Sequence, residues 1–524
     1  MESIKRHRAT VLTKALMSTL IAALLFTFLS SAWLVLEWIW FKPKRFERRL
    51  RALGFRGNRY RLLVGDMEEL TGMRNEALLR PISFGENICS RIHPFYAWII
   101  QNHGKRSFIW FGTTPRLVIT DPEEVKQVTN QIDDFRKMRL HPLAKHLFSG
   151  LLGHEGDKWT KHRKILNPAF RTEKLKVMIP AFYQSCDEIL SKWDRLVSEK
   201  EPVELDVWPD LKTLTSDAIS RTAFGSSFEE GRRIFELSNE LSALTIQAQL
   251  SVYIPGSRFF PSEMSKRMKT IREAIRDAIT AIITKREKLM EAGEPPSDDL
   301  LGILMESNYK EIQEQGVGMS YDDMVDECKL FYLAGNETTS CLLVWTMILL
   351  AKHSYWQERA REEVQQVIGD KIPDAEALVH LKIVSMILNE SLRMYPPAAA
   401  FSRSTYREVS LGETKLPGGL QVFVPTVLIH YDQELWGDDA QEFKPERFAD
   451  GVAKATNNRL SFLPFGWGPR ICIGQNFALM EAKIAMAMIL RRFSFTISPS
   501  YTHAPQTVVT LQPQHGAHLL LNKL

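Results

Sequence analysis

The segment Ser461-Phe462-Leu463-Pro464-Phe465-Gly466-Trp467-Gly468-Pro469-Arg470-Ile471-Cys472-Ile473-Gly474 places one cysteine between glycine-bearing turns. The glycines allow turns and close backbone approaches that a Cβ atom would block. An apolar stretch with helical periodicity follows, from Gln475 to Phe493. Cys472 therefore lies just before a helix, where backbone N–H groups and the positive helix end stabilise a thiolate. With no second Cys or His nearby, the thiolate suits one axial position on a planar metal cofactor rather than a zinc site, which needs four clustered ligands. On these residues alone, a buried and inert cysteine is the alternative.

The pattern Phe465-Gly466-x-Gly468-x-Arg470-x-Cys472-x-Gly474 specifies six of ten positions. It resembles the haem-binding loop of the cytochrome P-450 superfamily, the haem-thiolate monooxygenases. The resemblance implies a mainly α fold with small β-sheets and a haem b cofactor whose iron has Cys472 as its axial ligand. In such proteins the thiolate's electron donation favours O–O cleavage. The resemblance also implies that Arg470 faces a haem propionate and that Phe465 packs against the thiolate side of the ring.

Composition narrows the classes of partner and compartment. The chain has 524 residues, 44% of them hydrophobic, and a net charge of only +5. No basic stripe with interleaved aromatics is present, so nucleic acid is not expected as a partner. The cysteines are scattered and include no CxxC pair, which argues against a disulfide framework or a zinc ribbon and favours a reducing compartment. They are Cys89, Cys186, Cys328, Cys341 and Cys472.

The first residues predict a membrane anchor. Residues 15–36 are 22 residues without a formal charge, about the ~20 that a helix needs to cross a bilayer. This stretch is longer than a signal-peptide core, and a buried core helix is the alternative. Basic residues are dense from Lys42 to Arg51, which places that side in the cytosol. We therefore expect a short segment at 1–14, a transmembrane signal anchor at 15–36, a basic linker at 37–58 and a cytosolic catalytic domain at 59–524. The predicted location is the endoplasmic reticulum membrane, crossed once.

Other segments agree with the resemblance. The β-rich stretches 108–112 and 116–120 flank a Gly-Thr-Thr-Pro turn and predict a hairpin. Trp159 and Arg163 are four apart in a helical stretch and share one helix face. In the superfamily this W-x-x-x-R pattern contacts a haem propionate, and Arg403 matches another propionate-binding arginine.

An apolar helix is expected from Met324 to about His353, with a helix-start signal at Ser320-x-x-Asp323. Its middle, Ala334-Gly335-Asn336-Glu337-Thr338-Thr339, contains poor helix formers, which often marks a functional site; a polar kink is the alternative. This stretch resembles the oxygen-binding groove of the superfamily. The resemblance implies that Gly335 leaves room for dioxygen, Thr338 hydrogen-bonds it and Glu337 helps to relay protons, chemistry that suits a hydroxyl beside an acid.

Glu390 and Arg393 stand at i and i+3, a spacing that usually means a solvated pair. Followed by Phe443-Lys444-Pro445-Glu446-Arg447-Phe448 and then by the cysteine loop, they resemble the Glu-Arg-Arg triad of the superfamily. The resemblance implies that Glu390, Arg393 and Arg447 lock the core on the haem side and have no part in catalysis.

The resemblance covers nearly all the chain from about residue 54 and narrows to the plant seventy-two clan, which includes secologanin synthase. It implies electrons from NADPH through a reductase, cytochrome b5 as a candidate additional donor, and a small lipophilic terpenoid as substrate. Hydroxylation of a triterpenoid, steroidal, iridoid or gibberellin metabolite is the first hypothesis. Secologanin synthase-like oxidative cleavage of a ring C–C bond of an iridoid glucoside is the second. A non-catalytic haem-binding protein is the third, against which the intact Glu337 and Thr338 argue. Substrate contacts are expected from roughly 136–152, the lid at 172–290, 330–334, 398–401 and 507–509.

Overall fold

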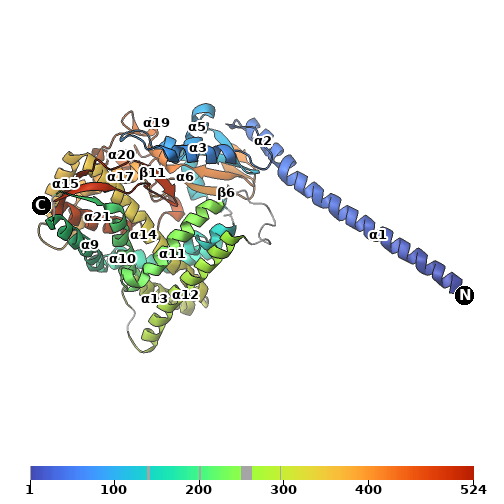
Figure 1. The fold of residues 1–524 in the computed structure, drawn as a ribbon, viewed down its shortest axis with the longest axis horizontal. Helices are drawn as coiled ribbons and strands as arrows, with labels where there is room; N and C mark the ends of the chain where they lie inside the picture. The colour runs from blue at the N-terminus through green and yellow to red at the C-terminus, as the bar shows by residue number, and fades with distance from the viewer. Residues whose placement is uncertain (1, 139–141, 200–201, 250–261, 295–296) are drawn as a thin grey trace.

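The structure is a computed structural model, and it describes residues 2–138, 142–199, 202–249, 262–294 and 297–524. Most of these residues form helices, which pack around small β-sheets (Figure 1). The predicted fold class, mainly α with small sheets, is confirmed. One long helix, α1, extends away from the body of the molecule as an isolated rod.

The α-helices are α1 (Glu2–Leu36), α2 (Lys42–Ala52), α3 (Met67–Leu79), α4 (Cys89–Ile92), α5 (Pro94–His103), α6 (Pro122–Asn130), α7 (Gly156–Leu166), α8 (Thr172–Val177), α9 (Ile179–Glu199), α10 (Val207–Phe224), α11 (Phe228–Gln249), α12 (Glu263–Glu291), α13 (Leu300–Gln315), α14 (Tyr321–Lys352), α15 (Ser354–Val367), α16 (Ala375–His380), α17 (Lys382–Met394), α18 (Thr426–His430), α19 (Gln433–Trp436), α20 (Val452–Ala455) and α21 (Gln475–Arg492). The strands are β1 (Arg56–Gly57), β2 (Ser107–Phe111), β3 (Thr114–Val118), β4 (Phe135–Lys137), β5 (Val203–Asp206), β6 (Phe401–Thr405), β7 (Val409–Leu411), β8 (Thr414–Leu416), β9 (Gln421–Val424), β10 (Phe493–Ile497), β11 (Pro505–Val508), β12 (Thr510–Pro513) and β13 (His518–Lys523).

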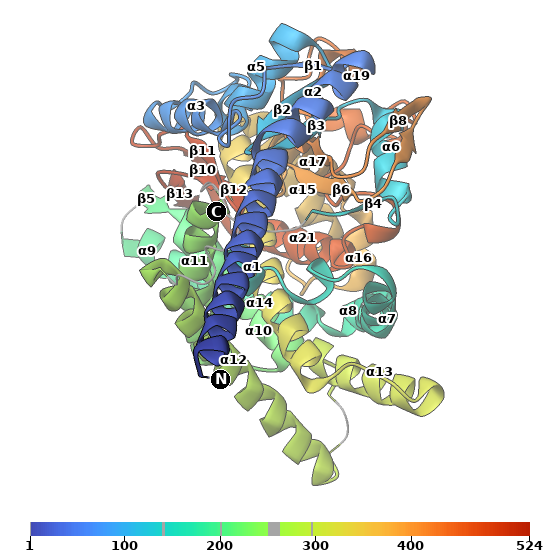
Figure 2. The same cartoon turned by 90° about the vertical axis from the view of Figure 1, so that its right-hand side faces the viewer.

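The largest sheet joins the two ends of the chain. Its strand order is β1-β2-β3-β9-β6-β4, so strands from the first 140 residues pair with strands beyond residue 400. The predicted hairpin is present as β2 and β3, paired antiparallel with Phe108 opposite Leu117. In Figure 2 the strands of this sheet lie in the upper part of the molecule, and helices α10, α12 and α13 lie in the lower part.

Helix α14 runs through the core. It begins at the predicted place, with a capping box in which the Ser320 and Asp323 side chains bond each other's backbone N–H. From Thr339 to Ala351 every residue is buried. Helix α10 packs along α14 at Gly335, where a Cβ would come within 2.7 Å of the Ile219 side chain. Ile219 thus packs against Gly335, where a larger side chain would collide with it. That Gly335 leaves room for dioxygen stays a prediction.

Residues 37–58, expected to be a basic linker, are folded. Residues Glu37–Phe41 form a π-helical turn, α2 follows directly, and β1 pairs with β2 in the large sheet. Leu50 on α2 is fully buried among apolar residues of the sheet and its surroundings. The basic side chains lie on the solvent side of α2 while its apolar side chains pack, so charge density alone did not distinguish this helix from a linker.

Two helices of the described chain are long and apolar enough to span a membrane. One lies near the N-terminus within Leu12–Ala52, and its apolar part is exposed. The other is α14, most of which is buried, so that its apolar character is accounted for by the core.

Candidate active site: the cysteine loop and the face of α14

The loop around Cys472 is fixed by its own backbone. The Cys472 N–H donates to the carbonyl of Phe465 at 2.9 Å, which closes the turn. Gly466 and Gly468 have φ of +72° and +73°, values that side chains other than glycine rarely adopt. A Cβ on Gly468 would also lie 2.6 Å from the Asn130 side chain. The glycines therefore shape the loop that presents the sulfur just before α21.

The Cys472 sulfur is set among protein atoms and yet has accessible surface. Desolvation raises the pKa of the Cys472 thiol above its usual value, whereas the Gly474 N–H and the charge of Arg163 lower it. The predicted stabilisation of the thiolate by the helix end is thus present but outweighed by burial. A bound metal cation reverses this balance, because a coordinating thiol is deprotonated outright.

The arginines predicted near the haem lie close to the loop. Arg163 on α7 donates to the carbonyl of Ile471, next to Cys472, at 3.0 Å. Arg470 forms an ion pair with Glu155 at 2.9 Å and lies over the Trp159 ring at 4.4 Å. The structure therefore brings Trp159, Arg163 and Arg470 together around one side of the cysteine loop.

Next to this side of the loop, Lys137, Arg403 and Arg470 form a positively charged cluster without an equal number of carboxylates. Desolvation, helped by repulsion from Arg470, lowers the pKa of Arg403 to about 10. The pKa of Lys137 falls to about 7 through desolvation and the charges of Arg470 and Arg403. Glu155 is the one carboxylate ion-paired within this cluster in the described chain. The Nε atoms of Arg403 and Arg470 are buried without a hydrogen-bond partner.

These features fit haem. A buried cluster of cations with orphaned donors is a binding place for anionic groups, and the two propionates of haem supply them. The accessible sulfur of Cys472 would bind the haem iron and supply it with a thiolate ligand. Arg403, Arg470 and Lys137 would hold the propionates, and the half-buried Phe465 side chain lies in the same loop as the ligand.

One face of α14 keeps accessible surface inside an otherwise buried helix. Asp326, Leu330, Ala334 and Thr338 recur at every fourth position and form this face, which we call the open stripe. The Thr338 hydroxyl donates to the Ala334 carbonyl at 2.8 Å, which leaves its oxygen free to accept a hydrogen bond. Between Asp326 and Thr338 the stripe is apolar, since Leu330 and Ala334 form it there.

Glu337 lies on a different face of α14. Its Oε1 pairs with Lys212 of α10 at 3.1 Å and its Oε2 accepts a hydrogen bond from Thr510 at 3.0 Å. Among the described residues, no hydrogen bond joins Glu337 to Thr338. The acid and the hydroxyl, adjacent in sequence, are thus held apart in space in this structure.

The predicted triad is assembled and buried. Glu390 and Arg393, both fully inaccessible, form a two-point pair with both distances at 2.8 Å. Arg447 Nε lies 3.5 Å from Glu390, and Asp439 neutralises Arg447 at 2.7 Å. Arg393 also donates to carbonyls of the following segment, such as that of Ala440 at 2.7 Å. The triad ties α17 to the chain that leads to the cysteine loop.

His430 connects the triad to the loop, and no sequence motif pointed to it. Its Nε2 accepts the N–H of Leu463 at 2.9 Å, so its Nδ1 carries the proton and donates to the Arg393 carbonyl at 2.9 Å. Desolvation, with a smaller effect of the Arg393 charge, lowers the pKa of His430 to about 3. Lys137 was also missed, because one lysine beside Arg136 has no spacing signature.

Comparison with known proteins agrees with this geometry. The fold and the site are those expected of a haem-binding protein in which a cysteine can bind the iron. The family profile "Cytochrome P450" matches residues 84–520, and the chain belongs to the cytochrome P450 family. Cytochrome P450 CYP72A219 of Panax ginseng is 54% identical over 496 residues, which cover 94% of this chain and 96% of that protein. Cytochrome P450 72A15 of Arabidopsis thaliana is 54% identical over 493 residues, covering 94% and 96%. The 7-deoxyloganic acid hydroxylase of Catharanthus roseus is 52% identical over 511 residues, covering 96% and 98%.

The predicted resemblance to the plant seventy-two clan is thereby confirmed. The protein is a monooxygenase of this family and uses haem iron with electrons that pass from NADPH through a reductase.

Replacing Glu390 tests the triad. In Glu390→Gln the buried Arg393 guanidinium loses its counter-charge, so we expect the free energy of unfolding to fall by about 3–5 kcal/mol. Urea unfolding followed by the reduced carbon monoxide spectrum measures the loss. The exposed pair of Glu263 and Lys266 has the same i,i+3 spacing, and Glu263→Gln should change stability by no more than about 0.5 kcal/mol. Equal effects of the two variants would contradict the structural role.

His430 predicts a pH dependence of stability. Because its folded pKa of about 3 lies below the usual value of 6.5, the unfolded chain binds one more proton between these values. The free energy of unfolding should therefore decrease as the pH falls from about 6.5, with a share from His430 of up to ~1.4 kcal/mol per pH unit. His430→Gln should make this decline shallower when unfolding is measured from pH 4 to 7. His515→Gln, at an exposed position, should leave it unchanged; a slope unaffected by His430→Gln would be inconsistent with the assignment.

Proposed function

We propose that the protein is a membrane-anchored monooxygenase that hydroxylates a terpenoid-type metabolite. The observation that carries the substrate class is the 52% identity, over 96% of the chain, to a hydroxylase whose name specifies the iridoid 7-deoxyloganic acid. The apolar residues Leu330 and Ala334 of the open stripe are consistent with a lipophilic substrate. Ala398, accessible between buried neighbours, adds a small apolar wall in a region expected to contact substrate. Two parts of the regions expected to contact substrate lie outside the described residues: 139–141 within 136–152, and 250–261 within the lid at 172–290.

Thr338 and Glu337 are the proposed proton-handling residues. Bound haem supplies the iron that activates dioxygen, and the chain must supply protons to that reaction. The support for Thr338 is that its hydroxyl, bonded to the Ala334 carbonyl, keeps a free lone pair on the open stripe. Glu337 reaches partly exposed Lys212, so its carboxylate is one hydrogen bond from solvent. A water molecule between Glu337 and Thr338 would complete the path, because the two side chains do not touch.

The proposed anchor is the apolar part of α1, residues 15–36, which crosses the endoplasmic reticulum membrane once. Its support is the full exposure of a long apolar helix that leaves the folded body (Figure 1). The catalytic domain, 59–524, then lies on the cytosolic side with α2 packed against it. There it meets the reductase, and cytochrome b5 is the proposed additional electron donor.

The substrate proposal is tested in microsomes that contain this protein and a plant reductase. NADPH is supplied with iridoids, triterpenoids, steroids and gibberellins, and products are identified by mass. We expect one class to gain a single oxygen atom, and Cys472→Ala to give no product because the axial ligand is lost.

A product that has lost two hydrogens with an opened ring would replace hydroxylation by the secologanin synthase-like reaction. No product from any class, with a normal reduced carbon monoxide spectrum, would overturn the terpenoid proposal while leaving family membership intact.

The role of Thr338 is tested by coupling. In Thr338→Ala the hydroxyl is lost and proton delivery slows, so we expect NADPH to be consumed with peroxide as the product and the yield of oxidised substrate per NADPH to fall at least about tenfold. Thr338→Ser should restore coupling. The neighbouring Thr339 is buried, so Thr339→Ala is the matched control and should remain coupled. Equal coupling in Thr338→Ala and wild type would refute the role.

A further inference from the structure

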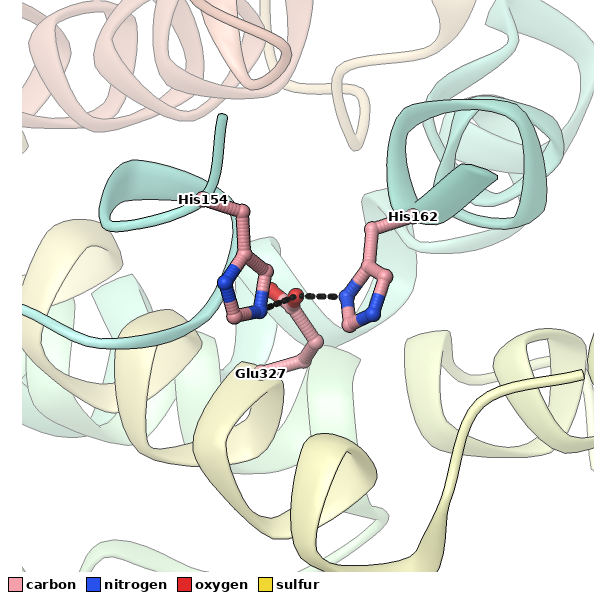
Figure 3. Close-up of side chains that lie close together, drawn as sticks. All are labelled: His154, His162 and Glu327. Carbon is pink, nitrogen blue, oxygen red and sulfur yellow. Dashed lines mark hydrogen bonds and ion pairs between the residues drawn. The ribbon is translucent and has the colours of Figure 1, made fainter. Parts of the chain in front are cut away.

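A second cluster of ligand-type side chains lies outside the haem site. His154 precedes α7, His162 lies on α7 and Glu327 lies on α14, and Figure 3 shows the three side chains pointing toward one another. His162 Nδ1 is 2.6 Å from Glu327 Oε1, and His154 Nε2 is 3.9 Å from the same oxygen. All three ligand-type atoms lie within 4.8 Å of one another.

The carboxylate of Glu327 is fully buried, and among the described residues no lysine or arginine contacts it. Its Oε2 accepts the backbone N–H of Leu151 at 2.9 Å, so the carboxylate is oriented with Oε1 toward both histidines. A Cβ on Gly150 would lie 2.8 Å from Oε2, which shows how closely the backbone encloses this oxygen. A buried carboxylate without a cation is unfavourable, and buried charges are normally paired or bound to metal.

The histidines have unused binding capacity. The Nε2 atoms of His154 and of fully buried His162 have no hydrogen-bond partner. A proton shared by His162 and Glu327 would satisfy that pair but would leave His154 Nε2 without a partner.

We propose that His154, His162 and Glu327 bind one zinc ion, through His154 Nε2, His162 Nδ1 and Glu327 Oε1. Two imidazoles and one carboxylate are an established zinc ligand set, in which water occupies the fourth position. Tetrahedral bonds of about 2.0–2.1 Å separate ligand atoms by about 3.4 Å. The observed distances of 2.6 and 3.9 Å from the two histidine nitrogens to Glu327 Oε1 bracket this value. Side-chain rotations that move these atoms by less than about 1 Å would therefore complete the site.

The surroundings also suit a metal. When His162 Nδ1 binds zinc, its proton is carried on Nε2, which lies 3.7 Å from Asp323 Oδ2. A carboxylate therefore lies near the ligating histidine, and a side-chain shift of less than about 1 Å would form the hydrogen bond that orients metal-bound imidazoles in known sites. Asp323 is itself held by Lys158 at 2.6 Å. His154 is partly exposed, which gives the ion a route of entry and a water ligand.

Zinc at this place would join α7 to α14. Helix α7 contributes Arg163 to the cysteine loop, and α14 carries Thr338, so the ion would act structurally by fixing these two helices against each other.

The test uses the full-length, haem-loaded protein in detergent, without a polyhistidine tag, so that haem occupies Cys472. After treatment with a chelator and removal of the chelator, ZnCl2 is titrated calorimetrically, and bound zinc per haem is measured by elemental analysis. We expect one zinc per haem, with affinity more than about 100-fold weaker in Glu327→Gln and in His154→Asn. His515→Asn, at an exposed histidine, should bind as wild type. Zinc should raise the unfolding temperature of wild type but not of His154→Asn.

X-ray absorption at the zinc edge identifies the ligands. Nitrogen and oxygen neighbours at about 2.0–2.1 Å without sulfur support the site, and a sulfur shell near 2.3 Å would assign the zinc to a cysteine and overturn it. No zinc binding by wild type, or binding unchanged in His154→Asn, would also overturn it. His154→Asn replaces a partly exposed side chain, and a normal reduced carbon monoxide spectrum confirms that the variant is folded.

Discussion

The position of one sulfur atom is set by hydrogen bonds to the backbone of its loop, one from within the loop and two from side chains in distant parts of the chain. Within the loop, the Cys472 N–H donates to Phe465. From one side His430 accepts the N–H of Leu463, and from the other Arg163 donates to the carbonyl beside Cys472. None of these contacts uses the sulfur itself, so its bonding capacity stays available for a metal. The triad then matters for the site because Arg393 fixes the carbonyl that orients His430.

The buried charges of this protein fall into two kinds that serve different ends. The pair of Glu390 and Arg393 is balanced and fully hydrogen-bonded, so it can be rigid without any ligand. The cluster of Lys137, Arg403 and Arg470 is not balanced; desolvation lowers the pKa of all three groups, and mutual repulsion lowers those of Lys137 and Arg403 further. Such a cluster is unfavourable alone and favourable with an anionic group, so it couples folding of this region to cofactor binding.

The elements that depend on local patterns could be predicted from the sequence. The features that depend on packing between distant residues could not. The Cys472 loop, the Ser320 capping box and the β2–β3 hairpin each depend on residues within a few positions of one another. His430 acts through partners 33 and 37 positions away, and the role of Gly335 depends on Ile219 of another helix. The folding of residues 37–58 depends on β2, whose paired residues lie 51 positions further on, as in Gly57 and Phe108. Propensity cannot show such contacts, because tertiary packing decides them.

Helix periodicity relates the positions of Glu327 and Thr338 on α14. Glu327 and Thr338 are 11 residues apart, which in a helix of 3.6 residues per turn is three turns and a rotation of only about 20°. They therefore share a face, with Ala334 between them. Contacts between Glu327 and α7 fix the rotation of α14 about its axis, since a buried acid cannot turn away from its partners without cost. Fixing that rotation also fixes the direction of the Thr338 hydroxyl, whereas Gly335, which packs against α10, sets the depth at which the helix lies. The two constraints act on different faces, and together they leave the open stripe one orientation.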